Sequence, residues 1–239
     1  MSLRISGLQK TFDGVVALAG VDIDVTLDKI LGIVGPNGSG KTTLVNVVTG
    51  TFAPTAGHVT WEGVDITGKP AYAIARLGIA RSFQQAMTFS GLTVEENVQV
   101  AWDHRSRRRR MRSLWTSPDE LLELVGLSDA RSSIAGALPF GNARQLGIAI
   151  CLATLPKLIF LDEPGAGLSD AELEPLTELI KQLHSMGIGV CIIDHNMNMI
   201  SALCHRLVVL DFGTKIAEGA PSTVLNDPKV REVYLGEDL

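Results

Sequence analysis

Three glycines, a lysine and two threonines fall within nine residues of this chain, between two apolar runs. The segment matches the pattern G-x-x-x-x-G-K-[ST], follows the strand-like run Ile30 to Val34 and precedes a helical apolar pattern, Leu44 to Val48. Such a loop curls until its backbone N–H groups point inward at phosphate oxygens, and the following helix adds its positive dipole end. We expect Lys41 to reach the β- and γ-phosphates and the Thr42 hydroxyl to ligate Mg²⁺. The residues predicted to hold a nucleoside triphosphate are Gly35, Pro36, Asn37, Gly38, Ser39, Gly40, Lys41, Thr42 and Thr43.

Two carboxylates follow a second apolar run, Leu158 to Leu161. Asp162 and Glu163 stand where a buried strand would end, and α/β sheets place their ligands at the carboxyl ends of strands. Asp162 is suited to hold Mg²⁺ through water, and Glu163 to accept a proton from, or orient, an attacking water. An apolar run ending in Asp-Glu is common by itself, but together with the phosphate loop it favours triphosphate hydrolysis.

Two polar side chains carry weaker signals. His195 follows the apolar run that ends in Asp194, and a neutral imidazole there is suited to contact the γ-phosphate or the catalytic water. Gln84 follows Phe83 and is suited to ligate Mg²⁺ or the water. A lone histidine at a strand end is more often structural. The kinase-like spelling Asp211-Phe212-Gly213 lacks a catalytic-loop partner and is better explained as a β-turn.

The elements that position these groups alternate between strands and helices, which predicts a mostly parallel core sheet. A helix between the last two buried strands is indicated by Leu176, Leu179, Ile180 and Leu183, with a capping box from Ser169 to Glu172 at its start. Other predictions are short strands in 3–34, a strand pair in 57–68, a short helix in 71–77, strands at 157–161 and 189–193, a hairpin in 207–217, and helices from 93 to 155 with breaks near Ser117-Pro118 and at Pro139-Phe140-Gly141.

The composition excludes several classes. No apolar run in the 239 residues approaches the roughly 18 needed to span a bilayer, and no apolar signal region begins the chain, so we expect a soluble protein or one attached to a membrane only through partners. Cys151, Cys191 and Cys204 lack metal-site spacing and are expected to be reduced core residues.

The net charge of −5 is unevenly distributed, because six arginines lie between Arg105 and Arg112. The remainder is more acidic than the total, so we expect no nucleic-acid partner. The arginine run is most simply a solvated face. A second interpretation is contact with anionic lipid or an acidic partner, aided by Trp102 and Trp115 on either side.

These motifs, in this order, give the chain a resemblance to ATP-binding cassette (ABC) ATPases over nearly its whole length. The resemblance implies an α/β phosphate-loop NTPase fold with a mostly parallel core sheet, an antiparallel β subdomain and an inserted helical subdomain. It implies one domain, 1–239, in which 1–92 and 156–239 form the catalytic core with the β subdomain and 93–155 the helical subdomain. ATP and Mg²⁺ are the implied cofactors.

The resemblance also implies roles for residues outside the motifs above. Phe12 would stack on adenine, which suits an aromatic face. Two cassettes would face head to tail, each ATP lying between one phosphate loop and the other chain's signature, here Leu138 to Asn142. Gly141, Asn142 and the following helix start would then contact the partner's γ-phosphate. A lone cassette should hydrolyse ATP poorly.

Within the family, the chain most resembles the cassettes of branched-chain amino acid importers. The supporting stretches are 80–84, 92–97, 162–168, 217–221 and the end Val233-Tyr234-Leu235-Gly236-Glu237. Such a system implies a second cassette, membrane permease subunits and a periplasmic binding protein, with this chain peripheral at the cytoplasmic face of the bacterial inner membrane. Met87, Phe89 and Leu92 suit a groove that docks those subunits or, equally, core packing.

Alternatives remain open. Lipopolysaccharide-export cassettes share Asp194-His195-Asn196 and the Tyr-Leu-Gly-Glu end, and urea or amide uptake is a further possibility. Soluble cassettes of DNA repair or translation usually carry two cassettes or long coiled-coil insertions. A regulatory module without turnover is disfavoured by Glu163 and His195.

The chain departs from the family pattern at its signature. Pro139, Phe140 and Asn142 replace the usual serine, glycine and glutamine, so a hydroxyl donor to the partner's γ-phosphate is missing. The continuation Ala143-Arg144-Gln145 is less usual, and Ser169 stands where many cassettes have aspartate. One of the two ATP sites is therefore expected to be less active than the other.

Overall fold

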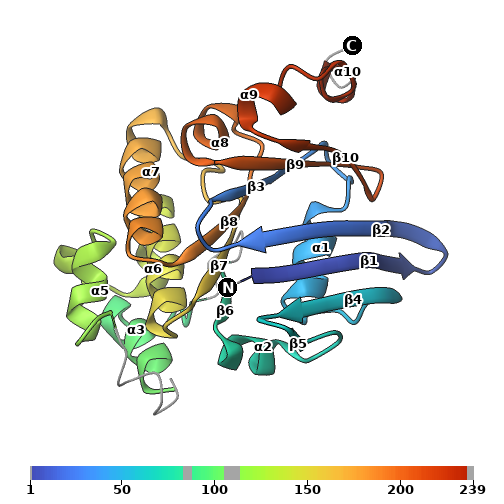
Figure 1. Cartoon of the computed structure of the whole chain (residues 1–239). Helices are drawn as coiled ribbons and strands as arrows, with labels where there is room; N and C mark the ends of the chain where they lie inside the picture. Colours follow the sequence, from blue (N-terminus) through green and yellow to red (C-terminus); the bar gives the residue numbers. More distant parts are fainter. Residues whose placement is uncertain (1, 83–87, 105–113, 236–239) are drawn as a thin grey trace.

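The computed structural model describes residues 2–82, 88–104 and 114–235, and within them the strands form two sheets. The larger sheet has the strand order β10-β9-β3-β8-β7-β6 (Figure 1). β10 runs antiparallel to β9, whereas the other neighbours are parallel. Its strands are β3 (Leu31–Val34), β6 (Ile79–Ser82), β7 (Leu158–Asp162), β8 (Gly189–Ile193), β9 (Arg206–Asp211) and β10 (Thr214–Gly219).

The smaller sheet is antiparallel, in the order β2-β1-β4-β5. Its strands are β1 (Ser2–Phe12), β2 (Val15–Thr26), β4 (Ala56–Trp61) and β5 (Val64–Asp65). The turn between β1 and β2 falls at Asp13-Gly14, and both residues have positive φ. β1 and β2 span 11 and 12 residues, longer than the short strands expected, because the strands continue through shifts in their pairing register instead of ending there.

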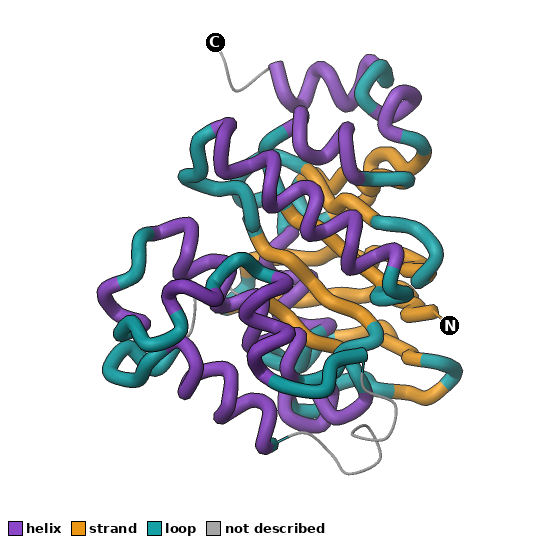
Figure 2. The backbone as a smooth tube through the Cα atoms, turned by 90° about the vertical axis from the view of Figure 1, so that its left-hand side faces the viewer, coloured by secondary structure: helices purple, strands orange, loops and turns teal. Residues whose placement is uncertain are grey.

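The helices lie on both sides of the larger sheet. Figure 1 shows α6 and α7 on one side and α1 with the antiparallel sheet on the other, and Figure 2 shows the helices of the first side in front of the strands. The helices are α1 (Lys41–Val48), α2 (Ala71–Leu77), α3 (Val94–Asp103), α5 (Pro118–Leu124), α6 (Phe140–Ala153), α7 (Asp170–Ser185), α8 (Met197–Leu203), α9 (Pro221–Val224) and α10 (Pro228–Leu235).

Alternate residues of the central strands pack into two different apolar clusters. In β7, Leu158 and Phe160 face the cluster shared with α1 and the antiparallel sheet, whereas Ile159 and Leu161 face the cluster shared with α6 and α7. All five residues of β7 are buried. Burial on both faces explains why these strands are continuous apolar runs instead of alternating ones. The strand ends that carry the candidate site are therefore fixed by packing on two sides.

Within the part of the chain that the structure describes, the elements predicted from sequence patterns are confirmed in type. α2 has the predicted bounds, α5 begins after Ser117, and α6 begins within Pro139-Phe140-Gly141. α7 begins after Ser169, whose N–H and hydroxyl both donate to the Glu172 carboxylate, and the helix continues through Pro175. The tail after the hairpin contains α9 and α10, for which no prediction was made.

The predicted surface role of two tryptophans is wrong. Trp102 is 7% exposed and Trp115 4%, and both pack into the apolar cluster of α3, α5 and α6. Their rings are large apolar surfaces that the small helices need for a core, which outweighs any headgroup contact. The arginine run between them lies outside the described residues. None of the described helices has the length and apolarity to cross a bilayer.

The three cysteines are free and buried, as predicted, which leads to a testable expectation. Burial raises the pKa of Cys151 and of Cys204 to about 12, and the pKa of Cys191 well above its ordinary value. At pH 8 a thiol with such a pKa is ionised in only about one molecule in 10⁴, so the native protein should react negligibly with a thiol-exchange reagent. Denatured protein should react at all three thiols.

The raised pKa values of the three thiols also determine how the stability of the fold changes with pH. Since the folded state holds these thiol protons more tightly than the unfolded chain, the contribution to stability is complete below about pH 9 and is lost as the pH rises toward 12. Thermal unfolding measured from pH 7 to 10.5 should show a falling midpoint above pH 9. Rapid modification of native thiols at pH 8 would contradict both expectations.

Candidate functional site

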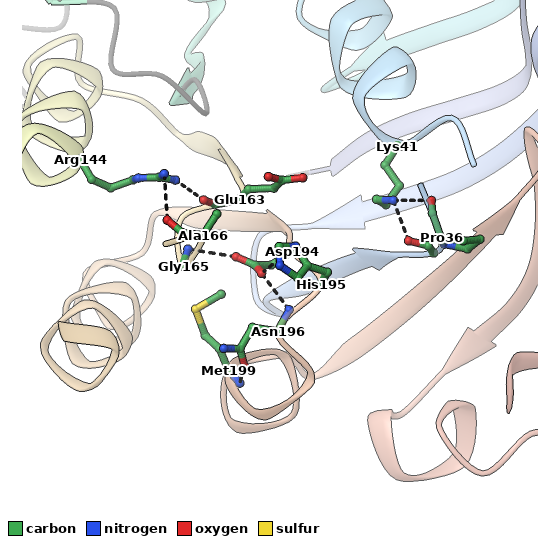
Figure 3. Close-up of polar contacts among 11 residues, drawn as sticks. Pro36, Lys41, Arg144, Glu163, Gly165, Ala166, Asp194, His195, Asn196 and Met199 are labelled. Atoms are coloured by element: carbon green, nitrogen blue, oxygen red, sulfur yellow. Dashed lines mark hydrogen bonds and ion pairs between the residues drawn. The ribbon is translucent and has the colours of Figure 1, made fainter. Parts of the chain in front are cut away.

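The carboxyl ends of three parallel strands bring most of the predicted residues to one edge of the sheet. The phosphate loop follows β3, Asp162 and Glu163 lie at the end of β7, and Asp194 and His195 follow β8, which lies between the other two strands. Figure 3 shows Lys41, Glu163 and His195 in this region, with the Lys41 ammonium directed at its own loop. Gln84, which follows β6, lies outside the described residues.

The phosphate loop has the backbone that its glycines predict. Gly35, Gly38 and Gly40 have φ values of 149°, 78° and 102°, and Gly40 is the N-cap of α1. Asn37, Gly38 and Thr42 are exposed, whereas the Ser39 side chain is buried. The first backbone N–H groups of a helix such as α1 have no partners within the helix, which is the arrangement that anions bind.

Lys41 is turned onto the loop itself. Its Nζ donates to the carbonyl oxygens of Gly35 at 2.6 Å and Pro36 at 2.7 Å (Figure 3). The Lys41 side chain is mostly buried, and its ammonium group lies among the atoms of the loop. These contacts hold the ammonium at the loop, from which it would exchange carbonyl oxygens for phosphate oxygens when a nucleotide enters.

Asp162 is buried and paired with an arginine that sequence reasoning did not single out. Arg81 of β6 donates from one terminal nitrogen to Asp162 Oδ2 and from the other to Asn46 Oδ1 of α1, both at 2.5 Å. The side chains of Arg81 and Asp162 are 6% and 5% exposed. The link joins the strand end that carries Asp162 to the helix that carries Lys41 and Thr42. An arginine inside the apolar strand β6 was the available signal, since a buried guanidinium requires a carboxylate or several acceptors.

Glu163 adopts a backbone conformation that is unusual for a residue with a side chain. Its φ is +47°, in the left-handed region, which costs about 1–2 kcal/mol relative to an ordinary conformation. Its N–H donates to Ile193 O at 2.6 Å, and its carbonyl accepts from Arg144. In Figure 3 the carboxylate points away from Arg144, toward the side of the site on which Lys41 lies. This arrangement presents the carboxylate to the space at the sheet edge.

His195 is exposed at the end of β8, and its neighbour Asp194 is the buried anchor. The Asp194 carboxylate accepts from the N–H groups of Gly165, at 3.0 Å, and Asn196, at 2.8 Å. The side chain of His195 is 68% exposed, with Nδ1 3.9 Å from Asp194 Oδ1. The histidine therefore remains accessible to a ligand, while Asp194 fixes the loops on both sides of it. In the sequence, Asp194 is distinguished only as the residue that ends an apolar run and begins the motif Asp194-His195-Asn196.

Phe12, Gly141 and Asn142 stand on elements other than the three strands that meet at this edge. Phe12, at the tip of the β1–β2 hairpin, is 36% exposed, packs edge to face with Phe52 and has Lys10 Nζ 4.7 Å from its ring centroid. Gly141 and Asn142 stand in the first turn of α6, over a hollow of about 130 Å³ between α6 and the start of α7. Gly141 and Asn142 begin a different helix from the one that follows the phosphate loop, which suits a site completed by a second chain.

The donors at the edge of the sheet suit Mg²⁺. Thr42 offers a hydroxyl at the start of α1 and Asp162 a carboxylate, both hard oxygen donors. Within the described ranges, no group of three or more His, Cys, Asp or Glu side chains is arranged to hold a metal. Few protein ligands are expected where substrate phosphates and water supply the remaining ones.

The turn Asp211-Phe212-Gly213, whose sequence resembles a kinase motif, lies beside the phosphate loop. Phe212 and Gly213 have φ values of 41° and 75°, as in a tight hairpin turn, which confirms the β-turn. The N–H of Gly213 donates to Ser39 O at 3.0 Å. A hollow of about 370 Å³ beside the loop is lined by Pro36, Asn37, Gly38, Ser39, Asp211, Phe212, Glu232 and Val233.

Two family profiles match the chain. The profile described as ABC transporter matches residues 18–166, and the profile described as branched-chain amino acid ATP-binding cassette transporter matches residues 214–239. The first covers more than half of the chain and includes the phosphate loop and Glu163.

Curated proteins and solved structures are similar over nearly the full length. The high-affinity branched-chain amino acid transport ATP-binding protein BraF of Pseudomonas aeruginosa is 35% identical, covering 98% of each chain, and LivG of Escherichia coli K12, described in the same words, is 34% identical over the same share. An ABC transporter cassette in its ADP conformation has a TM-score of 0.86 at 33% identity, covering 99% of both chains. A dimeric cassette in a post-hydrolysis state with ADP and phosphate has a TM-score of 0.80 at 25% identity, covering 92% of this chain and 98% of the other.

Proposed function

This chain belongs to the ABC transporter ATP-binding family and is an ATPase, and from that premise we propose that it powers a membrane importer of branched-chain or related amino acids. The observation that carries the proposal is the meeting of the phosphate loop with Asp162 and Glu163 at one sheet edge. The choice of solute class is supported by the branched-chain profile at residues 214–239 and by the similarity to BraF and LivG.

The proposed chemistry is hydrolysis of the γ-phosphate of ATP. The loop amides and Lys41 bind the β- and γ-phosphates, and the aromatic face of Phe12 stacks on adenine. Thr42, Asp162 and Gln84 are the residues proposed to hold Mg²⁺, which when bound offsets phosphate charge. Glu163 orients the attacking water and accepts its proton, and His195 contacts the γ-phosphate or that water.

A second cassette is proposed to complete the site. In a head-to-tail pair, Gly141, Asn142 and the N-terminal end of α6 contact the γ-phosphate bound by the partner's loop. The exposure of Phe140 and the hollow beside Gly141 and Asn142 support such an outward-facing role. The division into a core of 1–92 and 156–239 and a helical part of 93–155 stays a prediction.

The loop before α3 is proposed as the docking face for permease subunits. Phe89 is 58% exposed and Ile134 46%. Buried Asn97 holds Phe89 there, since its side chain accepts from the Phe89 N–H at 2.7 Å and donates to the Phe89 carbonyl at 3.1 Å. Leu92 is partly buried, and Met87 lies outside the described residues. A rigidly held, exposed aromatic ring suits an interface anchor.

The full assembly is proposed to include a periplasmic binding protein, with this chain peripheral at the cytoplasmic face of the inner membrane. The proposal is tested by reconstituting the cassettes with their permease subunits in liposomes and measuring ATP hydrolysis. We expect leucine-loaded binding protein to stimulate hydrolysis and uptake of labelled leucine. If lipopolysaccharide, urea or amides stimulate hydrolysis instead of leucine, the transported solute is one of these and not a branched-chain amino acid. If the protein has no membrane partners and its ATPase activity responds to DNA or ribosomes, the transport role is wrong.

A further inference from the structure

The backbone of Glu163 is held in a conformation that its own side chain disfavours. Among the described residues, the other non-glycine residues with positive φ lie in turns between strands or directly after a helix: Asp13, Glu62, Phe212 and Leu155. Glu163 instead directly follows β7, which lies between β8 and β6 in the larger sheet. A left-handed residue at a functional position persists only where its surroundings fix it. Its fixed points are Ile193, which accepts its N–H, and Arg144, which donates to its carbonyl.

Arg144 reaches this carbonyl from a different element, the second turn of α6. One terminal nitrogen donates to Glu163 O and the other to Ala166 O, the latter at 3.3 Å, so the fork spans the loop that follows β7 (Figure 3). The residue is 6% exposed. Burial lowers the pKa of Arg144, whereas Asp194, Glu163 and Asp162 act in the opposite direction. A buried guanidinium whose hydrogen bonds go to two backbone carbonyls is suited to fix a loop.

Phe140, a residue of the signature Leu138 to Asn142, packs against both Arg144 and the loop that follows β7. Its ring centroid lies 5.0 Å from the Arg144 guanidinium carbon, a cation–π contact. The same ring lies over Gly167, where an added Cβ would be 3.1 Å from it. Phe140 stands where the family usually has glycine. The Phe140 ring therefore contacts both Arg144 and the loop to which Arg144 donates its hydrogen bonds.

We propose that Arg144 is a positioning residue that fixes the backbone of Glu163 and ties it to the first turns of α6. The inference rests on the proposed role of Glu163 in hydrolysis. Because the start of α6 is also the part proposed to contact the partner's γ-phosphate, a shift of that helix would move Glu163 through Arg144. The two ATP sites would thereby be coupled within one chain.

The test compares Arg144→Met and Arg144→Lys with wild type in the assembled transporter. We expect Arg144→Met to lower kcat about 10- to 100-fold while KM for ATP and the affinity for nucleotide stay within about twofold, because misplacing a catalytic group by about 1 Å costs about 10²-fold. Arg144→Lys, which keeps the charge and can serve one carbonyl, should restore part of the rate. Hydrogen exchange of the segment 163–168 should be faster in both variants, which a loss of charge alone does not predict.

A double variant shows whether Arg144 acts through Glu163. If it does, Arg144→Met should add less than about twofold to the loss caused by Glu163→Gln, since the removed carboxylate no longer needs positioning. Arg206→Met is the matched control, because Arg206 also donates to a backbone carbonyl, that of Asp24, but near the opposite edge of the sheet. It should leave kcat unchanged.

The outcomes separate this inference from the proposed function. If Glu163→Gln retains wild-type hydrolysis, the proposed role of Glu163 fails. If Glu163→Gln is inactive while both Arg144 variants keep kcat within twofold, or if the double loss is multiplicative, the positioning role fails alone. If Arg144→Met does not fold, the same rate, affinity and exchange measurements on Arg144→Lys decide the question.

Discussion

Replacing Glu163 with glutamine is expected to reduce steady-state ATP hydrolysis by the assembled transporter about 10²- to 10⁴-fold. The amide keeps the size of the carboxylate but cannot accept the proton of the attacking water, which is the contribution of a general base. Nucleotide affinity should stay near that of wild type, because the carboxylate points into the space at the sheet edge and the loop amides remain intact. The measurement is phosphate release at saturating ATP, with affinity from a fluorescent nucleotide analogue.

Glu178→Gln is the matched control for this substitution. Glu178 is an exposed residue of α7 that pairs with Lys181 at 2.7 Å, and a surface pair of this kind contributes little. The control removes the same charge and should leave hydrolysis unchanged. Unaltered hydrolysis in Glu163→Gln would mean that the partner cassette's site performs the turnover, and the proposed role of Glu163 would then be wrong.

The second large effect is expected from Gly35→Ala at the start of the phosphate loop. A Cβ at Gly35 would lie 2.1 Å from Leu210 O and 2.7 Å from Ser39 Oγ, and φ is 149°. Contact this close with backbone forces the loop away from β9, so we expect a loss of about 2–4 kcal/mol in unfolding free energy and at least tenfold weaker nucleotide binding. For a chain of this size the melting midpoint should fall by about 5–15 °C.

Gly38→Ala in the same loop separates crowding from backbone strain. Gly38 has φ 78°, but nothing lies within 4 Å of its added Cβ. This variant should lose only about 1–2 kcal/mol, from the left-handed backbone alone. Melting curves without nucleotide give the comparison. Equal losses in the two variants would show that the contact with Leu210 O does not limit the loop.

Much of the architecture could be predicted because single segments encode it. The apolar run 158–161 marks a strand buried on both faces, and Asp162-Glu163 marks its end. Serine and proline at 117 and 118 mark the start of α5, since Ser117 is its N-cap and Pro118 its first residue. Local chemistry is sufficient in these cases, because the neighbours that decide the structure are adjacent in sequence.

The polar links within the site could not be predicted in the same way. Arg81 is 81 residues from Asp162, and Arg144 is 19 residues from Glu163 on another element. Each arginine is specified by the acceptors that the folded chain brings to it, which no local pattern records. Trp102 was misjudged for a related reason, since flanking arginines indicate a wet surface while the helix face that carries the ring is turned inward.

The position of β8 between β3 and β7 sets the distance between the phosphate loop and the strand end that carries Glu163. Neighbouring strands lie about 4.8 Å apart, so the loop that grips phosphates and the strand end that offers Glu163 are separated by two such spacings, about 10 Å. In the proposed hydrolysis, this distance is the room available to the γ-phosphate and the attacking water. The strand order, through the one strand that lies between β3 and β7, therefore sets how far the proposed catalytic carboxylate stands from the phosphate loop.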